Sequence, residues 1–201
     1  SGQWWETAPQ MALANNSVCY TDKPDGETFL REWTSLVESK SGERGIFNRI
    51  SAKEQAKKYG RRDPDHEFGT NPCSEIILRP YQFCNLTEVV IREKDKFDDL
   101  KKKVIIATIL GTVQSTLTKF PYLRKVWNKN TEEERLLGVS LTGIMDNELT
   151  NGRKHGLEKT LTALREVAVE TNREWSEILR IPQSTAITCV KPSGTVSQLV
   201  D

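Results

Sequence analysis

The fold is decided by residues 86–119, which read LTEVVIREKDKFDDLKKKVIIATILGTVQSTLTK. Residues 86–91 are rich in β-branched side chains, which is typical of a strand. From about Asp95 to Lys119 the spacing of apolar residues predicts a long helix, which ends before Pro121. The middle of this helix is apolar nearly all round, so we expect burial on more than one side. A strand that leads into a long helix predicts an α/β fold.

Strand-like and helix-like segments continue on both sides of this stretch. We expect further strands at residues 17–20, 74–78, 138–145 and 186–190. We expect further helices at residues 9–15, 29–41, 51–59 and from 157 until just before Pro182. Ser51 with Glu54, and Thr131 with Glu134, have the spacing of capping boxes. The connections are long enough for parallel crossovers, which supports the α/β class.

The composition describes a folded chain of balanced charge. The 201 residues include 36% hydrophobic residues, enough for a core and too many for a disordered chain. Because 29 Lys and Arg face 28 Asp and Glu, we expect no direct DNA binding through bulk charge. The apolar runs are far shorter than the ~20 residues that cross a bilayer, and no basic-then-apolar leader opens the sequence. We therefore expect a soluble, intracellular protein with no membrane partner.

The four cysteines are Cys19, Cys73, Cys84 and Cys189. They are too few and too scattered to staple a small fold by disulfides. None belongs to a CxxC pair and the chain has two histidines, so we expect no metal site. Each cysteine is then either a small buried apolar residue or a reactive group.

The run NPCSE at residues 71–75 places a thiol two positions from a carboxamide and two from a carboxylate. In an extended segment, Asn71, Cys73 and Glu75 would point to the same side. Such a set offers a sulfur centre, an acid or base, and a hydrogen-bonding amide. From the spacing alone, a buried cysteine flanked by polar loop residues is the more common explanation.

Two other runs are compatible with chemistry without requiring it. Cys84 follows Cys73 by eleven positions, and a disulfide would need Cα atoms within roughly 7 Å. From the sequence alone, packing of Cys84 beneath its strand is the favoured explanation. The run KPSGTVS at residues 191–197 follows a strand and opens a helix, an arrangement that presents N–H groups to an anion. Many such turns bind nothing. The run NNS at residues 15–17 we interpret as a polar turn.

Taken together, the motifs resemble those of the catalytic large chain of ribonucleotide reductases, specifically the adenosylcobalamin-dependent (class II), monomeric type. Six stretches carry the resemblance in the same order as in that family: 14–18 (ANNSV), 42–48 (GERGIFN), 69–76 (GTNPCSEI), 84–89 (CNLTEV), 137–144 (LGVSLTGI) and 190–196 (VKPSGTV). Six colinear matches over nearly the whole chain are specific, and with them the reactive interpretation of Cys73 becomes the better one.

The resemblance implies a ten-stranded α/β barrel in which a finger loop carries Cys73 through the centre. Residues 1–201 would form one partial catalytic barrel domain, without the family's upstream allosteric region and later strands. Cys73 matches the cysteine that becomes a thiyl radical, and we expect it in a dry pocket. Glu75 matches the carboxylate that takes the 3′-hydroxyl proton, and Asn71 matches the amide that binds the ribose hydroxyls. Cys84 matches one of two thiols that are oxidised to a disulfide.

The resemblance also implies ligands and partners. The substrate would be a ribonucleoside triphosphate, bound by the residues Ser17, Pro192, Ser193, Gly194, Thr195 and Val196. The cofactor would be adenosylcobalamin, with most of its binding surface outside these residues. The reductant would be thioredoxin or a similar dithiol, and complementing reductase segments are expected partners. The location would be the cytoplasm of a bacterium, or of a host cell if a phage encodes the chain.

The matches leave two alternatives open. The chain could be a catalytically incomplete binding or assembly piece of a split reductase, although it keeps Asn71, Cys73, Glu75 and Cys84. It could also belong to a ribonucleoside-diphosphate reductase whose radical comes from a di-metal subunit, although residues 84–89 and 191–196 look closer to the cobalamin type. Arg44 stands where many reductases have proline, which should loosen that turn. We expect the isolated chain to be inactive.

Overall fold

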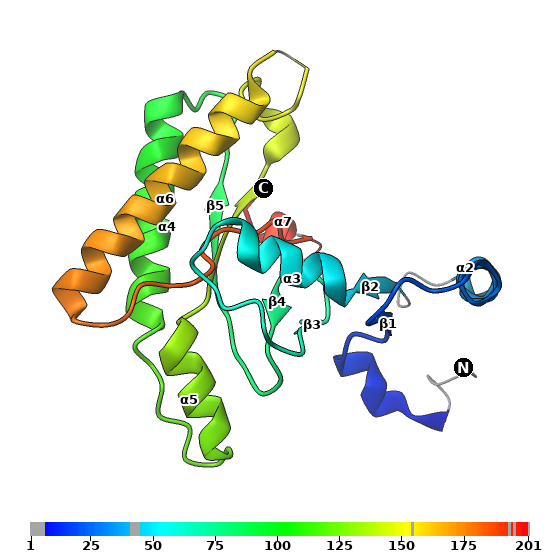
Figure 1. Cartoon of the computed structure of the whole chain (residues 1–201). Coiled ribbons are helices and arrows are strands. Elements are labelled where there is room, and N and C mark those ends of the chain that lie inside the picture. The colour runs from blue at the N-terminus through cyan, green and yellow to red at the C-terminus, as the bar shows by residue number, and fades with distance from the viewer. Residues whose placement is uncertain (1–6, 41–44, 154, 193, 195, 201) are drawn as a thin grey trace. The chain divides into compact units, whose positions relative to one another are not determined.

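The computed structural model describes residues 7–40, 45–153, 155–192, 194 and 196–200 (Figure 1). These residues form two compact units that divide after Pro80. Each unit is described by itself. The single partial barrel domain expected for residues 1–201 therefore stays a prediction.

The second unit is built on two parallel strands, β5 (Asn85–Val90) and β6 (Leu137–Thr142). Helices α4 (Phe97–Gln114) and α6 (Leu157–Leu179) lie side by side along these strands (Figure 1). The alternate residues Val89 and Val139 join Leu100, Val104 and Leu164 in the core, because every second side chain of a strand points to the helices. The predicted strand, helix and strand are confirmed, and they place Glu88 and its cross-strand neighbour Ser140 on the opposite face.

Residues 186–190 lie along the free edge of β6. The N–H groups of Leu137 and Val139 donate to the carbonyls of Ala186 and Ile187, and the N–H of Cys189 donates to Val139. The contact amounts to one parallel bridge between Val139 and Thr188, so the predicted strand over 186–190 is wrong as a full strand. Residues 186–190 nevertheless pair with β6, and they bring Lys191 next to that strand.

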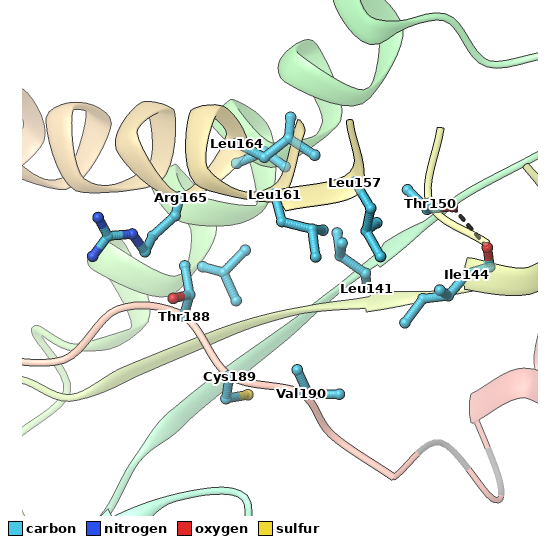
Figure 2. Close-up of a pocket in the computed structure, with 12 residues that line it drawn as sticks. Leu141, Ile144, Thr150, Leu157, Leu161, Leu164, Arg165, Thr188, Cys189 and Val190 are labelled. Atoms are coloured by element: carbon cyan, nitrogen blue, oxygen red, sulfur yellow. Dashed lines mark hydrogen bonds between the residues drawn. The ribbon is translucent and has the colours of Figure 1, made fainter. Parts of the chain in front are cut away.

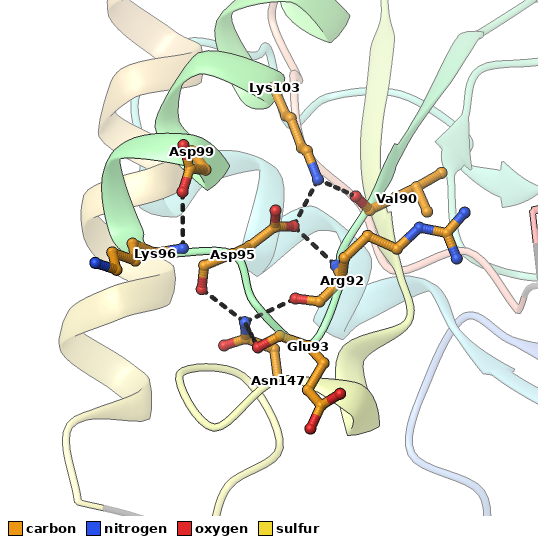
Figure 3. Close-up of polar contacts among 8 residues, drawn as sticks. All are labelled: Val90, Arg92, Glu93, Asp95, Lys96, Asp99, Lys103 and Asn147. Carbon is orange, nitrogen blue, oxygen red and sulfur yellow. Dashed lines mark hydrogen bonds and ion pairs between the residues drawn. The ribbon is translucent and has the colours of Figure 1, made fainter.

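The turn from β5 into α4 is held by two polar side chains (Figure 3). The carboxylate of Asp95 accepts from the Arg92 N–H at 2.8 Å and from the Lys103 ammonium at 2.5 Å. The side-chain amide of Asn147 donates to the carbonyls of Arg92, Glu93 and Asp95. Because this loop is fixed, α4 begins at Phe97, two residues later than predicted. The helix ends at Gln114, so the end predicted at Lys119 is wrong by five residues.

Two further expectations for the second unit are wrong. Helix α4 buries one face only, since the side chains of Ile106 and Leu110 are 58% and 60% exposed. Helix α5 (Lys125–Glu134) contains Thr131 in its last turns, so Thr131 and Glu134 form no capping box. Glu134 is buried at the end of α5, where it accepts a hydrogen bond from the amide of Gln82 at 2.6 Å. The motif spacing is right, but a cap requires its first residue to precede the helix.

The first unit consists of short elements. In chain order they are η1 (Pro9–Leu13), β1 (Val18–Tyr20), α2 (Gly26–Ser39), β2 (Ile46–Asn48), α3 (Arg49–Lys58), β3 (Gly69–Thr70) and β4 (Ile77–Leu78). Strands β1 and β2 pair in parallel, and β3 and β4 pair antiparallel. Helix α3 is capped by Asn48, whose side chain accepts from the Ser51 N–H, so the cap predicted at Ser51 is wrong.

The second unit ends with η2 (Ile144–Asp146) after β6 and with α7 (Val196–Leu199) near the carboxyl end. Within the part of the chain that the structure describes, no helix has both the length and the apolar character needed to span a membrane.

Candidate active site

Cys73 lies in a tight turn between β3 and β4. The Ser74 N–H donates to the Asn71 carbonyl at 3.0 Å, and Ser74 has a φ of 64°. The predicted extended segment over 74–78 is therefore wrong apart from Ile77–Leu78. The reason is Asn71-Pro72, because asparagine followed by proline favours a turn. The argument that Asn71, Cys73 and Glu75 point to one side of a strand does not apply to this turn.

The side chain of Asn71 closes the loop that carries Cys73. Its Oδ1 accepts from the Ile76 N–H at 3.0 Å. The backbone N–H of Asn71 donates to the Ile76 carbonyl at 3.3 Å. The oxygen of this carboxamide is thus occupied by the fold. Its Nδ2 group is the part of Asn71 that remains to donate to a ligand.

Cys73 is exposed and Glu75 is half-buried. The expectation of a dry pocket around the thiol is wrong for the described residues, because the thiol is at the tip of a polar turn. The turn nevertheless keeps the amide, the thiol and the carboxylate within one short loop of fixed backbone. This part of the predicted constellation follows from adjacency in the sequence.

Asn15 contacts the Cys73 turn, and the sequence analysis missed it. Its Nδ2 donates to the Pro72 carbonyl at 3.1 Å and to the Ser74 hydroxyl at 2.7 Å, on the two sides of Cys73. Its Oδ1 accepts from the N–H of Ser17 at 2.9 Å. Ser17, predicted to bind substrate, is half-buried and directly precedes β1. No local pattern at residues 15–17 signals a contact with a segment 57 residues away.

In the second unit, half-buried Cys84 directly precedes β5 and Glu88 lies on that strand. Glu88 pairs across the ladder with Ser140 of β6, whose hydroxyl accepts from the Lys191 N–H at 3.0 Å. Burial raises the pKa of Glu88 above its ordinary value, although a hydrogen bond from Ser140 and the charge of Lys191 act in the opposite direction. Glu88 is a second group that the sequence analysis missed, since an acidic residue in a strand has no motif of its own.

All four cysteines belong to the described residues, and none of them forms a disulfide. Cys73 lies in the first unit and Cys84 in the second. An approach of these two cysteines, which the spacing allowed without favouring it, is therefore not tested.

The predicted phosphate-binding turn is described in part. Pro192 and Gly194 are exposed, and Val196 is half-buried at the start of α7. Ser193 and Thr195 lie outside the described residues. A helix does open after Lys191, as expected.

Comparison with known proteins decides which family the chain belongs to. No family model matches the chain. The adenosylcobalamin-dependent ribonucleoside-triphosphate reductase of Lactobacillus gasseri is 28% identical over 92% of this chain and 28% of its own length. The enzyme of the same name from Lacticaseibacillus paracasei is 30% identical over 92% of this chain and 28% of its own length. The chain belongs to this family.

A solved structure of a B-12 dependent (class II) ribonucleotide reductase is similar to the reductase chain described here. The two share 25% identity with a TM-score of 0.51, over 65% of this chain and 21% of the other. The mixed α/β fold is thereby confirmed. The chain spans 28% of the length of the reductases that it matches, so activity, substrate and cofactor are matters for proposal.

One pocket in the second unit of this reductase family member does not fit adenosylcobalamin. A pocket of about 320 Å³ lies between β6, residues 188–190 and the start of α6 (Figure 2). Leu141, Ile144, Leu157 and Leu161 face into it, which suits a small apolar group and not a corrinoid with its polar side arms. Among the described residues, no group of three or more His, Cys, Asp or Glu side chains could hold a metal ion. We assign no residue to the cofactor.

Proposed function

We propose that the chain is part of the catalytic barrel of an adenosylcobalamin-dependent ribonucleoside-triphosphate reductase, which makes deoxyribonucleotides for DNA synthesis. The observation that carries this proposal is the fixed turn of residues 71–76, with Cys73 at its tip, in a chain that aligns with such reductases over 92% of its residues. The relatives' names favour the cobalamin type over a reductase with a di-metal subunit.

In the proposed reaction, the thiyl radical of Cys73 abstracts the 3′-hydrogen of the ribose. Glu75 accepts the proton of the 3′-hydroxyl, and the Nδ2 group of Asn71 donates to a ribose hydroxyl. The 2′-hydroxyl then leaves as water. Two thiols, one of them Cys84, supply the two electrons and become a disulfide, and Cys73 regains its radical when it returns the hydrogen. Adenosylcobalamin, when bound, supplies the initial radical, and no described residue is assigned to that step.

The other parts of the proposal concern binding. Ser17 and the turn of residues 192–196, with Pro192, Ser193, Gly194, Thr195 and Val196, would hold the ribonucleoside triphosphate. A dithiol protein such as thioredoxin would reduce the disulfide. The ten-stranded barrel would be completed by complementing reductase segments, and the proposed location is the cytoplasm.

The test is complementation with reductase segments that supply the parts of the relatives that this chain does not span. We expect no deoxyribonucleotide from the chain alone, and product when the segments, adenosylcobalamin and a dithiol are added. Cys73→Ser should abolish the product while nucleotide binding persists, because a hydroxyl does not replace the thiyl radical. Cys19→Ser is the matched control, since Cys19 is also exposed but lies in β1. Product formation by the Cys73→Ser chain would disprove the thiyl assignment.

A further inference from the structure

The residues on both sides of Cys73 are held by one side chain from elsewhere in the sequence. Asn15 Nδ2 donates to the carbonyl of Pro72, the residue before Cys73, at 3.1 Å. The same nitrogen donates to the hydroxyl of Ser74, the residue after Cys73, at 2.7 Å. A single amide group therefore bonds the residue before the thiol-bearing residue and the residue after it.

The turn needs such support because Ser74 has a left-handed backbone. A φ of 64° is unfavourable for a residue with a side chain, because its Cβ crowds the backbone in the left-handed conformation. The local bonds from Asn71 close the loop at its base, at Ile76 and at the Ser74 N–H. They leave the Pro72 carbonyl and the Ser74 side chain to Asn15.

Asn15 is itself fixed. Its Oδ1 accepts from the Ser17 N–H, and the neighbouring Val18 N–H donates to the Gly45 carbonyl where β1 joins β2. Both functions of the Asn15 amide are therefore in use, one toward β1 and one toward the turn. Asn15 therefore connects the parallel pair β1–β2 to the Cys73 turn.

We infer that Asn15 is the positioning residue for Cys73, because its amide fixes the carbonyl before the thiol and the side chain after it. The role of the thiol in this inference rests on the proposed function. Asn15 forms hydrogen bonds to Pro72 and Ser74, so it acts on Cys73 through the turn that carries it. Hydrogen abstraction requires the sulfur at a defined distance from the ribose, and a displacement of about 1 Å costs roughly 100-fold in rate.

The first experiment measures the turn directly in the full 201-residue chain. Cysteines are labelled with ¹³C and ¹⁵N, and the signals of Cys73 are compared in wild-type, Asn15→Ala and Asn16→Ala chains. We expect Asn15→Ala to shift and broaden the Cys73 signals while those of Cys19 stay in place. Asn16→Ala is the matched control, because Asn16 donates only to the nearby carbonyls of Met11 and Ala14. Unchanged Cys73 signals in Asn15→Ala, or equal changes in Asn16→Ala, would overturn the inference.

A second pair of variants separates positioning from general loss of folding. Ser74→Ala removes one of the two bonds at an exposed position, and we expect a smaller shift of the same signals. Asn15→Ala combined with Ser74→Gly should restore sharp Cys73 signals, because glycine adopts a positive φ without support. If the glycine gives no recovery, Asn15 does not act through the backbone of the turn.

The complemented enzyme distinguishes this inference from the proposed function. There we expect Asn15→Ala to lower kcat about 100-fold. Any rise in KM should be small beside this loss, because the variant reaches Ser17, a proposed substrate residue, only through its backbone N–H. A large rise in KM with unchanged kcat would make Asn15 a binding residue and overturn the inference. If the wild-type mixture makes no product but the signals of Cys73 respond as expected, the proposed function fails and the positioning by Asn15 stands.

Discussion

Gly143 occupies a position where a side chain cannot fit. It follows β6 with a φ of 74°, and an added Cβ would lie 2.4 Å from the Ile91 carbonyl oxygen. We predict that Gly143→Ala lowers the free energy of unfolding by about 3 kcal/mol or more, since a backbone clash adds to the cost of a left-handed alanine. Urea denaturation followed by circular dichroism measures the change.

Gly152 provides the control for this prediction. It has the same φ of 74°, but the nearest atom to an added Cβ is a leucine methyl at an ordinary 3.6 Å. Gly152→Ala should therefore cost only the conformational part, about 1 kcal/mol. Equal losses in the two variants would show that the contact with Ile91 does not matter. The left-handed backbone of Gly143 also explains why the strand predicted to reach residue 145 ends at Thr142.

At the scale of elements, sequence periodicity predicted the helices and strands whose formation depends on residues close together in the chain. The strand at β5, the helix α4, the strand at β6 and the helix α6 follow from apolar patterns within each segment. The wrong predictions concern segments whose structure depends on a local turn or on contacts with distant residues. The turn at Asn71 overrides the β-like composition of residues 74–78, and the residues at 186–190 depend on the edge of β6 for their pairing.

The candidate site shows the same division. The NPCSE motif identified Asn71, Cys73 and Glu75 because they are adjacent in sequence. Asn15 could not be identified in this way, because its contact with the turn spans 57 residues and depends on the positions of β1 and the turn in space. Glu88 also escaped notice, since its importance comes from Ser140 and Lys191 on other elements.

The pairing of β5 with β6 carries a pH dependence through Glu88. Burial is the largest influence on its pKa and raises it above the ordinary value, against the Ser140 hydrogen bond and the Lys191 charge. Folding therefore favours the protonated acid. The resulting contribution to stability is full at low pH and is lost as pH rises from the unfolded pKa through the higher folded pKa.

We predict that Glu88→Gln raises the free energy of unfolding at pH 7 by up to about 0.5 kcal/mol, a small figure because the side chain is only partly buried and solvent screens it. At pH 4 the gain should vanish, since the wild-type acid is then protonated. Urea denaturation at both pH values measures the difference, with the exposed Glu93→Gln as control. A gain of the same size at pH 4 would contradict this account.

At the scale of the whole molecule, the apolar core is unevenly divided. The cluster of Val89, Ile91, Leu100, Val104, Ala107, Leu137, Val139, Leu164, Ala168 and Ile187 lies entirely after Pro80. Before that point, the buried apolar residues among those described are Ala52, Phe68 and Ile76. Because burial of apolar surface is the dominant favourable contribution to folding, the second unit has far more of it.

We therefore predict that residues 81–201, expressed alone, unfold in one cooperative transition, whereas residues 1–80 do not. The second fragment keeps both strands of its parallel pair, both long helices and the Asn147 amide that closes the β5–α4 loop. The first has strands of two or three residues and little core to offset its chain entropy. Thermal melts by circular dichroism test this directly. A cooperative melt of residues 1–80 would mean that the hydrogen bonds around Asn15 and Asn71 hold the first unit without a large core. A missing transition in residues 81–201 would show that the core of the second unit requires the first unit.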